Sequence, residues 1–291
     1  MISITNPNKT TAISRRQFLR GGAGLALASL FGLSGNGASA NTVRIIRHVQ
    51  TNARKVCLTY DDLWSEYYAL RIGREYYRRN IQLTFFPAGR AVLNNLERPN
   101  PGYENLYPRL RDMGHEFGCH LFTHRVIKDL SLQQLVDEEM VPTLYEMRRA
   151  LGPSFHPVGL RPPYGQVTEA LKQLSARYSI PLILWGLDSQ DAICTKQNQD
   201  KRCECSAQAN FDSYARIWGP TLPDGICGEQ QCAEKCVDAI LQNYESYLRP
   251  GTIILHHTIK TSFQAIQPTL NLLRAWNMQP VPLSELLRLA S

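Results

Sequence analysis

The chain has 291 residues, of which 43% are hydrophobic and 20% are charged. This balance excludes an intrinsically disordered chain and fits one large α/β domain or two small ones. The formal net charge is +7, but the first forty residues hold four basic residues and no acid, so the remainder has 28 basic residues against 25 acidic ones. That small excess gives no reason to expect a nucleic-acid partner.

The first forty residues have the parts of an export signal. The charged stretch "SRRQFLR" (14–20) precedes the apolar run "LALASLFGL", and "ASA" ends at Ala40 as a cleavage site. The paired Arg15 and Arg16 resemble a twin-arginine signal. The apolar run is too short to cross a bilayer comfortably. We therefore expect the twin-arginine machinery to export residues 41–291 to the periplasm or the cell exterior, with no stable membrane span. A retained signal anchor is the alternative.

From Val43 onward, short apolar runs typical of strands alternate with stretches that have apolar residues at helical spacing. The predicted strands are "KVCLTY" (55–60), "IQLTFFP" (81–87), "HEFGCH" (115–120), "IPLILWGLD" (180–188), "GTIILHH" (251–257) and the start of 279–290. The stretch "PVGLRPPYG" (157–165) is predicted as a strand that runs into a Pro-Gly turn. The predicted helices are 65–80, 103–114, 131–152, 167–178, 263–277 and the end of 279–290. In the long helix, Ser131 is the expected N-cap and Gly152 the stop, while Pro142 should kink or divide it.

This alternation predicts an α/β protein with parallel strands and helices outside them. About six to eight such units in one domain favour a barrel over an open sheet, with the chemistry at the carboxyl ends of the strands. One segment, about 189–236, breaks the pattern, because it is polar, rich in Gln, Asn, Cys and Gly, and too long for an ordinary connection. We expect it to be a Cys-rich insertion.

The insertion holds most of the cysteines, and export permits them to form disulfides. Their spacing does not determine a pairing. A bound metal or iron–sulfur cluster is the alternative, although the spacing matches no strong signature. Cys57 and Cys119 lie on predicted strands and are expected to be free buried thiols, or bonded to each other if those strands are neighbours. The insertion cysteines are Cys194, Cys203, Cys205, Cys227, Cys232 and Cys236.

Polar residues follow several predicted strands at the point where each strand ends. Taken singly, each has an ordinary explanation, such as a turn residue, a helix cap or a satisfied core histidine. Their recurrence at successive strand ends weakens that explanation, because a barrel gathers these ends around one mouth. The residues are Asp61, Asp62, His120, His124, Arg161, Tyr164, Asp188, His256 and His257.

This set fits the chemistry of a divalent metal ion. One carboxylate and two imidazoles make a three-ligand site that leaves a position open for water, which is the catalytic arrangement. A second carboxylate beside the site can accept a proton from the attacking water. The paired aspartates then have separate roles, with Asp62 as a metal ligand and Asp61 as a base.

The same residues resemble the motifs of the polysaccharide deacetylase family, the NodB-homology carbohydrate esterases. "TYDD" is similar to the family's Thr-Phe-Asp-Asp, "HLFTH" to His-Ser/Thr-x-x-His, and "RPPYG" to Arg-x-Pro-Tyr/Phe-Gly. "LWGLD" and "LHH" resemble the fourth and fifth motifs, and the latter selects His257 over His256. The resemblance runs from about Arg54 to Leu287 and implies a distorted (β/α) barrel of about seven strands.

The resemblance also implies roles for the acid and base. Asp61 is the expected general base and Arg161 tunes its basicity. His257 is the expected general acid that protonates the leaving amine, and Asp188 is expected to pair with its imidazole.

The remaining implied roles concern the metal and the substrate. The family usually binds zinc, with cobalt or nickel in some members, and the backbone N–H of Tyr164 is expected to stabilise the oxyanion. Trp185 and Leu255 are expected to line the pocket for the acetyl methyl. The implied metal ligands are Asp62, His120 and His124.

The implied function is an exported, metal-dependent hydrolase that removes N-acetyl groups from an amino-sugar polysaccharide. An O-acetyl esterase, a non-sugar amidase and a catalytically silent glycan-binding protein are the alternatives. Three departures from the family pattern stand out, and one of them is that the insertion between Asp188 and the last motif is longer than in the simplest members. Leu63 and Trp64 replace a Gly-Pro pair, which leaves the choice of substrate open, and Leu121 replaces a Ser/Thr, which removes a local hydrogen bond but no metal ligand.

Overall fold

The computed structural model describes residues 43–192 and 230–290, with side chains from Cys236 onward in the second range. These described residues form one compact unit. The predicted export signal and the insertion cysteines before Cys236 lie outside the described residues and side chains, so the disulfides stay a prediction. Within the described ranges, no helix combines the length and apolarity that a bilayer crossing requires.

A parallel sheet forms the centre of this unit. Its strand order is β4-β3-β2-β7-β6, and β8 pairs with the first residues of β2. Every pairing within it is parallel, which confirms the predicted α/β class. The strands are β2 (Lys55–Asp62), β3 (Thr84–Pro87), β4 (Glu116–Phe117), β6 (Leu187–Asp188), β7 (Ile253–His257) and β8 (Gln279–Pro280).

A second, two-stranded parallel sheet pairs β1 (Ile45–Ile46) with β5 (Leu182–Ile183). Single parallel bridges join Leu160 to Cys119 on one side and to Leu182 on the other, so Leu160 links the two sheets. The predicted strand 157–165 is therefore reduced to isolated bridges, and its end, Pro163–Gly165, is a 3₁₀ turn. Two prolines in a row cannot donate ladder hydrogen bonds, which explains the interruption.

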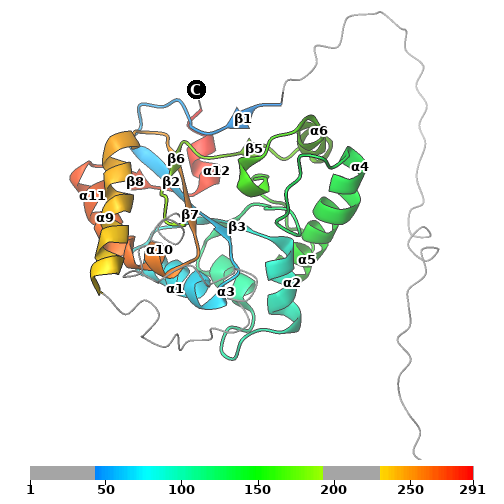
Figure 1. Ribbon diagram of the computed structural model, residues 1–291, viewed down its shortest axis with the longest axis horizontal. Coiled ribbons are helices and arrows are strands. Elements are labelled where there is room, and N and C mark those ends of the chain that lie inside the picture. Colours follow the sequence, from blue (N-terminus) through cyan, green and yellow to red (C-terminus); the bar gives the residue numbers. More distant parts are fainter. Residues whose placement is uncertain (1–42, 193–229, 291) are drawn as a thin grey trace, which may run out of the picture. The chain divides into compact units, whose positions relative to one another are not determined.

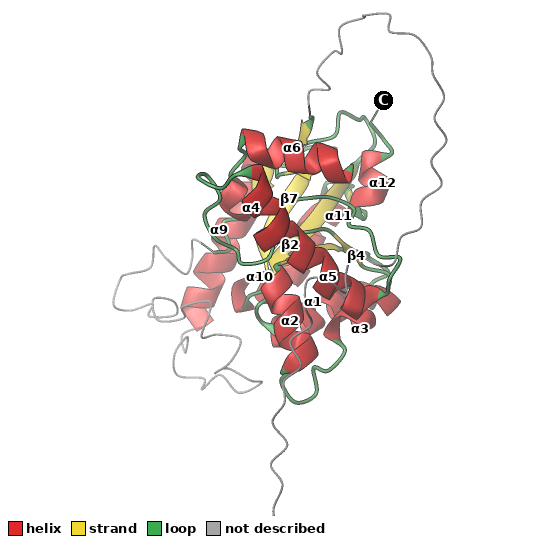
Figure 2. Cartoon of the chain, turned by 90° about the vertical axis from the view of Figure 1, so that its right-hand side faces the viewer, coloured by secondary structure: helices red, strands yellow, loops and turns green. Residues whose placement is uncertain are grey.

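Helices surround these strands in both views (Figures 1 and 2). The predicted helices are present with small shifts in their bounds, whereas α2 and most of α9 were not predicted. Ser65 caps α1 as its hydroxyl accepts from the amide of Tyr68. The helices are α1 (Glu66–Tyr77), α2 (Gly89–Glu97), α3 (Leu106–Asp112), α6 (Glu169–Tyr178), α9 (Gln230–Tyr247), α10 (Lys260–Gln264), α11 (Ile266–Ala275) and α12 (Leu283–Leu287).

The long helix predicted over 131–152 is divided as its proline suggested. It consists of α4 (Leu132–Gln134), a π-helical segment Leu135–Met140, and α5 (Val141–Leu151). Ser131 forms a capping box with Gln134, and Gly152 ends the helix at φ 106°. Pro142 lacks an N–H and its ring clashes with the carbonyl four residues earlier, so the helix widens just before it.

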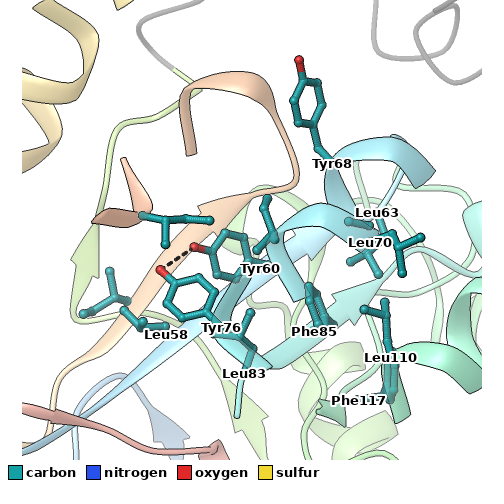
Figure 3. Packing of buried hydrophobic residues seen from close by; sticks show 14 of the residues in the cluster. Leu58, Tyr60, Leu63, Tyr68, Leu70, Tyr76, Leu83, Phe85, Leu110 and Phe117 are labelled. Carbon is teal, nitrogen blue, oxygen red and sulfur yellow. Dashed lines mark hydrogen bonds between the residues drawn. The ribbon is translucent and has the colours of Figure 1, made fainter. Parts of the chain in front are cut away.

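The core packs α1 and α3 against one face of β2 and β3. Figure 3 shows Tyr60 and Tyr76 among leucines and Phe85, with their hydroxyls 3.1 Å apart. Cys57 and Cys119 are buried free thiols, and β3 lies between their strands, so the alternative of a bond between them is wrong.

The predicted insertion begins too early at residue 189. Ser189 and Asp191 are fully buried against the end of the central sheet. At its other end, helix α9 already begins at Gln230. Because the residues after Asp188 are polar, the pattern assigned three residues of the folded domain to the insertion.

Candidate active site

The two aspartates lie at the carboxyl end of β2, between β3 and β7. Asp61 is in register with His257 of β7, and Asp62 with Pro87 of β3. Asp62 and Leu63 have φ values of 73° and 61°, in the left-handed region that non-glycine residues rarely adopt. This turn of the backbone ends the strand. The two neighbouring carboxylates acquire different partners.

Asp62, His120 and His124 form a compact group of possible metal ligands, with their ligand atoms within 4.8 Å of one another. The Oδ1 atom of Asp62 lies 3.3 Å from Nε2 of His120 and 3.1 Å from Nε2 of His124. This buried oxygen accepts no well-aligned hydrogen bond. Burial favours its neutral form, but the two imidazoles outweigh that effect and hold the pKa of Asp62 well below its usual range.

The orientation of His120 favours metal binding. Its Nδ1 lies 2.8 Å from the carbonyl oxygen of Arg161, so Nδ1–H is the donor and Nε2 is the nitrogen that faces Asp62 and can bind a metal. An orphaned carboxylate oxygen beside imidazole nitrogens is the donor set of a divalent transition metal such as zinc. The residues present therefore fit the metal that the sequence predicted.

Asp61 is paired with Arg161, as expected. The Arg161 guanidinium is fully buried and donates to Oδ1 of Asp61 at 2.6 Å and to the hydroxyl of Thr59 at 2.7 Å. Its planar face lies over the ring of Phe86, 4.1 Å from the centroid. Because one carboxylate oxygen is held by Arg161, the other, Oδ2, is left on the side of His120, 3.9 Å from its Nε2.

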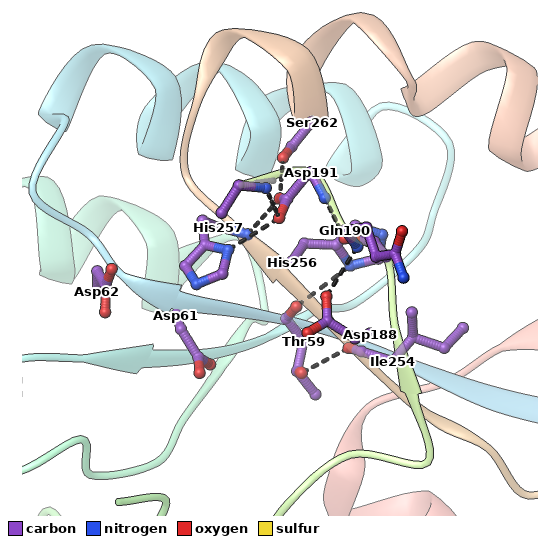
Figure 4. Close-up of polar contacts among 12 residues, drawn as sticks. Thr59, Asp61, Asp62, Asp188, Gln190, Asp191, Ile254, His256, His257 and Ser262 are labelled. Atoms are coloured by element: carbon purple, nitrogen blue, oxygen red, sulfur yellow. Dashed lines mark hydrogen bonds and ion pairs between the residues drawn. The ribbon is translucent and has the colours of Figure 1, made fainter. Parts of the chain in front are cut away.

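His257 is paired with Asp191 and not with Asp188, which corrects the sequence prediction. Nδ1 of His257 lies 2.8 Å from Oδ1 of Asp191, and the His257 amide donates to Oδ2 at 2.6 Å. Ser262 also donates to Asp191. Asp188 instead accepts from the amide of Gln190 at 2.7 Å (Figure 4). Asp188 ends β6, whereas Asp191, three residues later, reaches the end of β7.

Sequence reasoning missed Asp191 because it was assigned to the insertion. The available signal was weak, namely a second carboxylate in "LDSQDA" after the same strand. Only the return of the chain over β7, which buries Asp191 completely, places that carboxylate on the imidazole.

The two adjacent histidines of β7 have opposite electrostatics. Burial lowers the pKa of His257, but the Asp191 carboxylate outweighs this effect and raises it to about 10. Burial lowers the pKa of His256 to about 4, and its ring stacks on Tyr60 and bonds to the hydroxyl of Tyr244 at 2.6 Å. Alternate side chains of a strand point to opposite faces, so His256 is a core residue while His257 faces the site.

The stability of the metal-free protein should depend on pH through the His257–Asp191 pair. The pKa of His257 rises from 6.5 to about 10 on folding, so its contribution is complete below 6.5, declines as the pH rises, and is lost above about 10. We expect the difference in free energy of unfolding between wild type and His257→Gln to shrink along this range. Denaturant titrations at several pH values measure it, and a difference independent of pH would contradict the pairing.

Aromatic side chains flank the histidines. The ring centroid of Tyr164 lies 4.8 Å from that of His124, and the ring centroid of Trp64 lies 6.4 Å from it in a T-shaped arrangement. Tyr164 has φ 57°. The predicted roles of its amide, of Trp185 and of the buried Leu255 remain proposals. Trp64 also lines a pocket of about 300 Å³ with Glu66, and none of the candidate metal ligands lines this pocket.

The fold and the site together define a class of parallel α/β protein. In this class the strand ends bring together a candidate metal site and two candidate acid–base groups, each of which has its own charged partner. The model of the polysaccharide deacetylase family matches residues 48–183, so this part of the chain is similar to that family. The match includes Asp61, Asp62, His120, His124 and Arg161. It ends before His257, which the sequence already placed at the site, and before Asp191, which only the structure brings there.

Curated relatives match about half of the chain. Peptidoglycan-N-acetylglucosamine deacetylase PgdA of Listeria monocytogenes is 30% identical over 142 residues, which are 49% of this chain and 27% of that protein. Chitooligosaccharide deacetylase of Bradyrhizobium sp. is 27% identical over 141 residues, 48% of this chain and 60% of that protein. The chain thus spans less than two thirds of either relative.

Solved structures share the fold over most of the chain. A family 4 carbohydrate esterase pseudoenzyme from Bacillus anthracis has a TM-score of 0.63 at 21% identity, covering 84% of this chain and 69% of that one. A family 4 carbohydrate esterase from Streptomyces lividans in complex with acetate has a TM-score of 0.56 at 22% identity, covering 79% and 93%. Since a pseudoenzyme shares the fold, the fold alone does not indicate activity.

Proposed function

We propose that this chain is an exported, metal-dependent hydrolase that removes N-acetyl groups from an amino-sugar polysaccharide. The observation that carries the proposal is the orphaned Oδ1 of Asp62 between two imidazole Nε2 atoms, with Asp61 and His257 in register beside it. The relatives named as peptidoglycan and chitooligosaccharide deacetylases support an acetylated amino-sugar polymer as the substrate class.

In this proposal, Asp62, His120 and His124 hold one divalent cation, which we expect to be zinc, with cobalt or nickel as alternatives. When bound, it supplies Lewis acidity, which acidifies water and polarises a carbonyl. The amide N–H of Tyr164 donates to the developing oxyanion, and Trp185 and Leu255 enclose the acetyl methyl.

The protein groups then divide the proton transfers. Asp61 accepts the proton of the attacking water through Oδ2, because Oδ1 is occupied by Arg161. His257 enters as the imidazolium, since its pKa is raised to about 10, and donates a proton to the leaving sugar amine. Asp191 keeps that charge in place by accepting from Nδ1. A divalent cation nearby opposes the imidazolium and shifts its pKa back toward neutrality.

The alternatives use the same residues. An O-acetyl esterase or a non-sugar amidase needs the same base and acid, and a silent glycan-binding protein needs neither. The separate partners of Asp61 and His257 favour catalysis, because a binding protein has no use for a buried arginine on one carboxylate and an imidazolium with its own counter-charge.

The test measures acetate release by the purified protein from chitin oligomers, peptidoglycan, poly-N-acetylglucosamine and acetylxylan. Release from one of the first three supports the proposal, and release from acetylxylan alone indicates the esterase. Glycan binding with no acetate from any substrate would overturn the assignment as an enzyme.

Removing the metal should abolish the activity without unfolding the protein. Dialysis against EDTA is expected to lower acetate release to background, and added zinc or cobalt to restore it, because water is a poor nucleophile at neutral pH without a Lewis acid. Circular dichroism before and after chelation is the control for folding. Full activity after metal analysis finds no bound cation would contradict a metal-dependent mechanism.

A further inference from the structure

The loop that carries His124 is held in an unfavourable backbone conformation. Leu121 and His124 both have positive φ, at 61° and 58°. L-residues with a side chain avoid this region, so such a loop persists only where surrounding contacts determine it. On one side of the loop, the first turn of α2 supplies these contacts. The amides of Gly89 and Arg90 donate to the carbonyls of Leu121 and Phe122 at 2.7 and 3.0 Å.

On the other side of the loop that carries His124, a single carboxylate, that of Glu139, supplies the contacts. Its Oε2 accepts from the amides of Phe122 and Thr123 at 2.8 and 2.9 Å, and its Oε1 accepts from the Thr123 hydroxyl at 2.6 Å. Nε of Arg125 lies 2.8 Å from Oε1 as an ion pair. Glu139 is fully buried, so its charge is balanced by these contacts and not by water.

Glu139 reaches the loop because of the π-helical segment. A π-helical turn holds one residue more than an α-helical turn, so it rotates later side chains by about 100° relative to a regular helix. Glu139 lies inside this segment, three residues before Pro142, which accounts for the widening. Single π turns in otherwise regular helices occur frequently at functional sites.

We propose that Glu139 is a positioning residue for the metal site. It holds the left-handed backbone at His124, so that the imidazole stays 3.1 Å from Asp62, and replaces the local hydrogen bond lost with Leu121. This inference rests on the proposed metal site. Glu139 lies 15 residues after His124 in the sequence and supports the second half of "HLFTH" from there.

Two substitutions test it, Glu139→Ala and Glu139→Gln, with zinc as the probe. Glutamine keeps an oxygen for the two amides but places an amide group against Thr123 and Arg125. Competition with a chromophoric chelator should show zinc affinity reduced by about 100-fold for E139A and about tenfold for E139Q, the range found when a ligand loses its outer partner. Hydrogen exchange at Phe122 and Thr123 should become faster in both.

The matched control is Glu138→Gln, because Glu138 pairs with the same Arg125 at 2.5 Å but contacts no loop amide. It should bind zinc as wild type does. A second readout separates positioning from stability: zinc should raise the Tm less in the Glu139 variants than in wild type, since the increment follows affinity.

A purely structural role gives a different result. Glu139 variants with a lower Tm, wild-type zinc affinity and an unchanged zinc increment would overturn the inference. If E139A does not fold, E139Q carries the comparison. Wild-type protein that binds no zinc would instead overturn the metal site itself.

Discussion

Replacing Asp61 with asparagine should lower kcat for deacetylation by about 10²- to 10⁴-fold, the usual contribution of general base catalysis. Asparagine keeps the shape and an oxygen for Arg161 but cannot accept the proton of the attacking water. We expect the variant to fold and to bind zinc, because Asp62, His120 and His124 are unchanged. Acetate release, metal content and Tm measured on the same preparation check all three expectations.

The matched control is the same substitution at another strand end, Asp188→Asn. Asp188 accepts a hydrogen bond from the amide of Gln190 and bonds to neither Asp61 nor His257, so its loss should change kcat much less than the loss of Asp61. Normal activity of Asp61→Asn would refute the base assignment. A variant that loses zinc as well would show that Asp61 supports the metal.

Replacing Asp191 with asparagine should also lower kcat by about 10²- to 10⁴-fold, through the acid and not the base. An amide in place of the carboxylate removes the charge that raises the pKa of His257 to about 10. The pKa then falls, so the rate should decline with rising pH at a lower pH than in wild type. A pH–rate profile of kcat detects this displacement, while zinc affinity should be unchanged.

Two variants calibrate that result. Ser262→Ala removes one donor to Asp191 and leaves its bond to the imidazole, so its effect should be intermediate. Asp188→Asn tests the partner that the motif resemblance implied. A large loss with Asp188→Asn and none with Asp191→Asn would reverse the assignment made from the structure.

The secondary structure could be predicted wherever a local pattern caused it. The apolar run of β2, the caps of the long helix and its division near Pro142 follow from periodicity, a capping hydroxyl and a missing N–H. The stretch 157–165 has apolar residues typical of a strand followed by a Pro-Gly turn, and the turn is present at Pro163–Gly165. Its pairing is limited to Leu160, which depends on neighbours that the pattern does not contain.

Most of the candidate site could be predicted as well, because strand-end residues meet once parallel pairing is assumed. Asp61, Asp62, His120, His124, Arg161 and His257 come together as that argument requires. The partner of His257 could not be predicted, since Asp188 and Asp191 both follow the same strand. Only the path of the chain over β7 decides which of the two carboxylates reaches the imidazole. Glu139 gave no signal, because a glutamate on an amphipathic helix usually faces solvent.

The amino-acid sequence alone thus determined which side chains can bind a metal or transfer a proton, and at which strand end each of them lies. Residue type and spacing are local properties, so the sequence contains both. The tertiary structure decided which of two nearby carboxylates contacts the imidazole of His257, and which glutamate supports "HLFTH". Those choices depend on contacts between segments that are distant along the chain, and burial makes them consequential because a buried charge must find its partner within the protein.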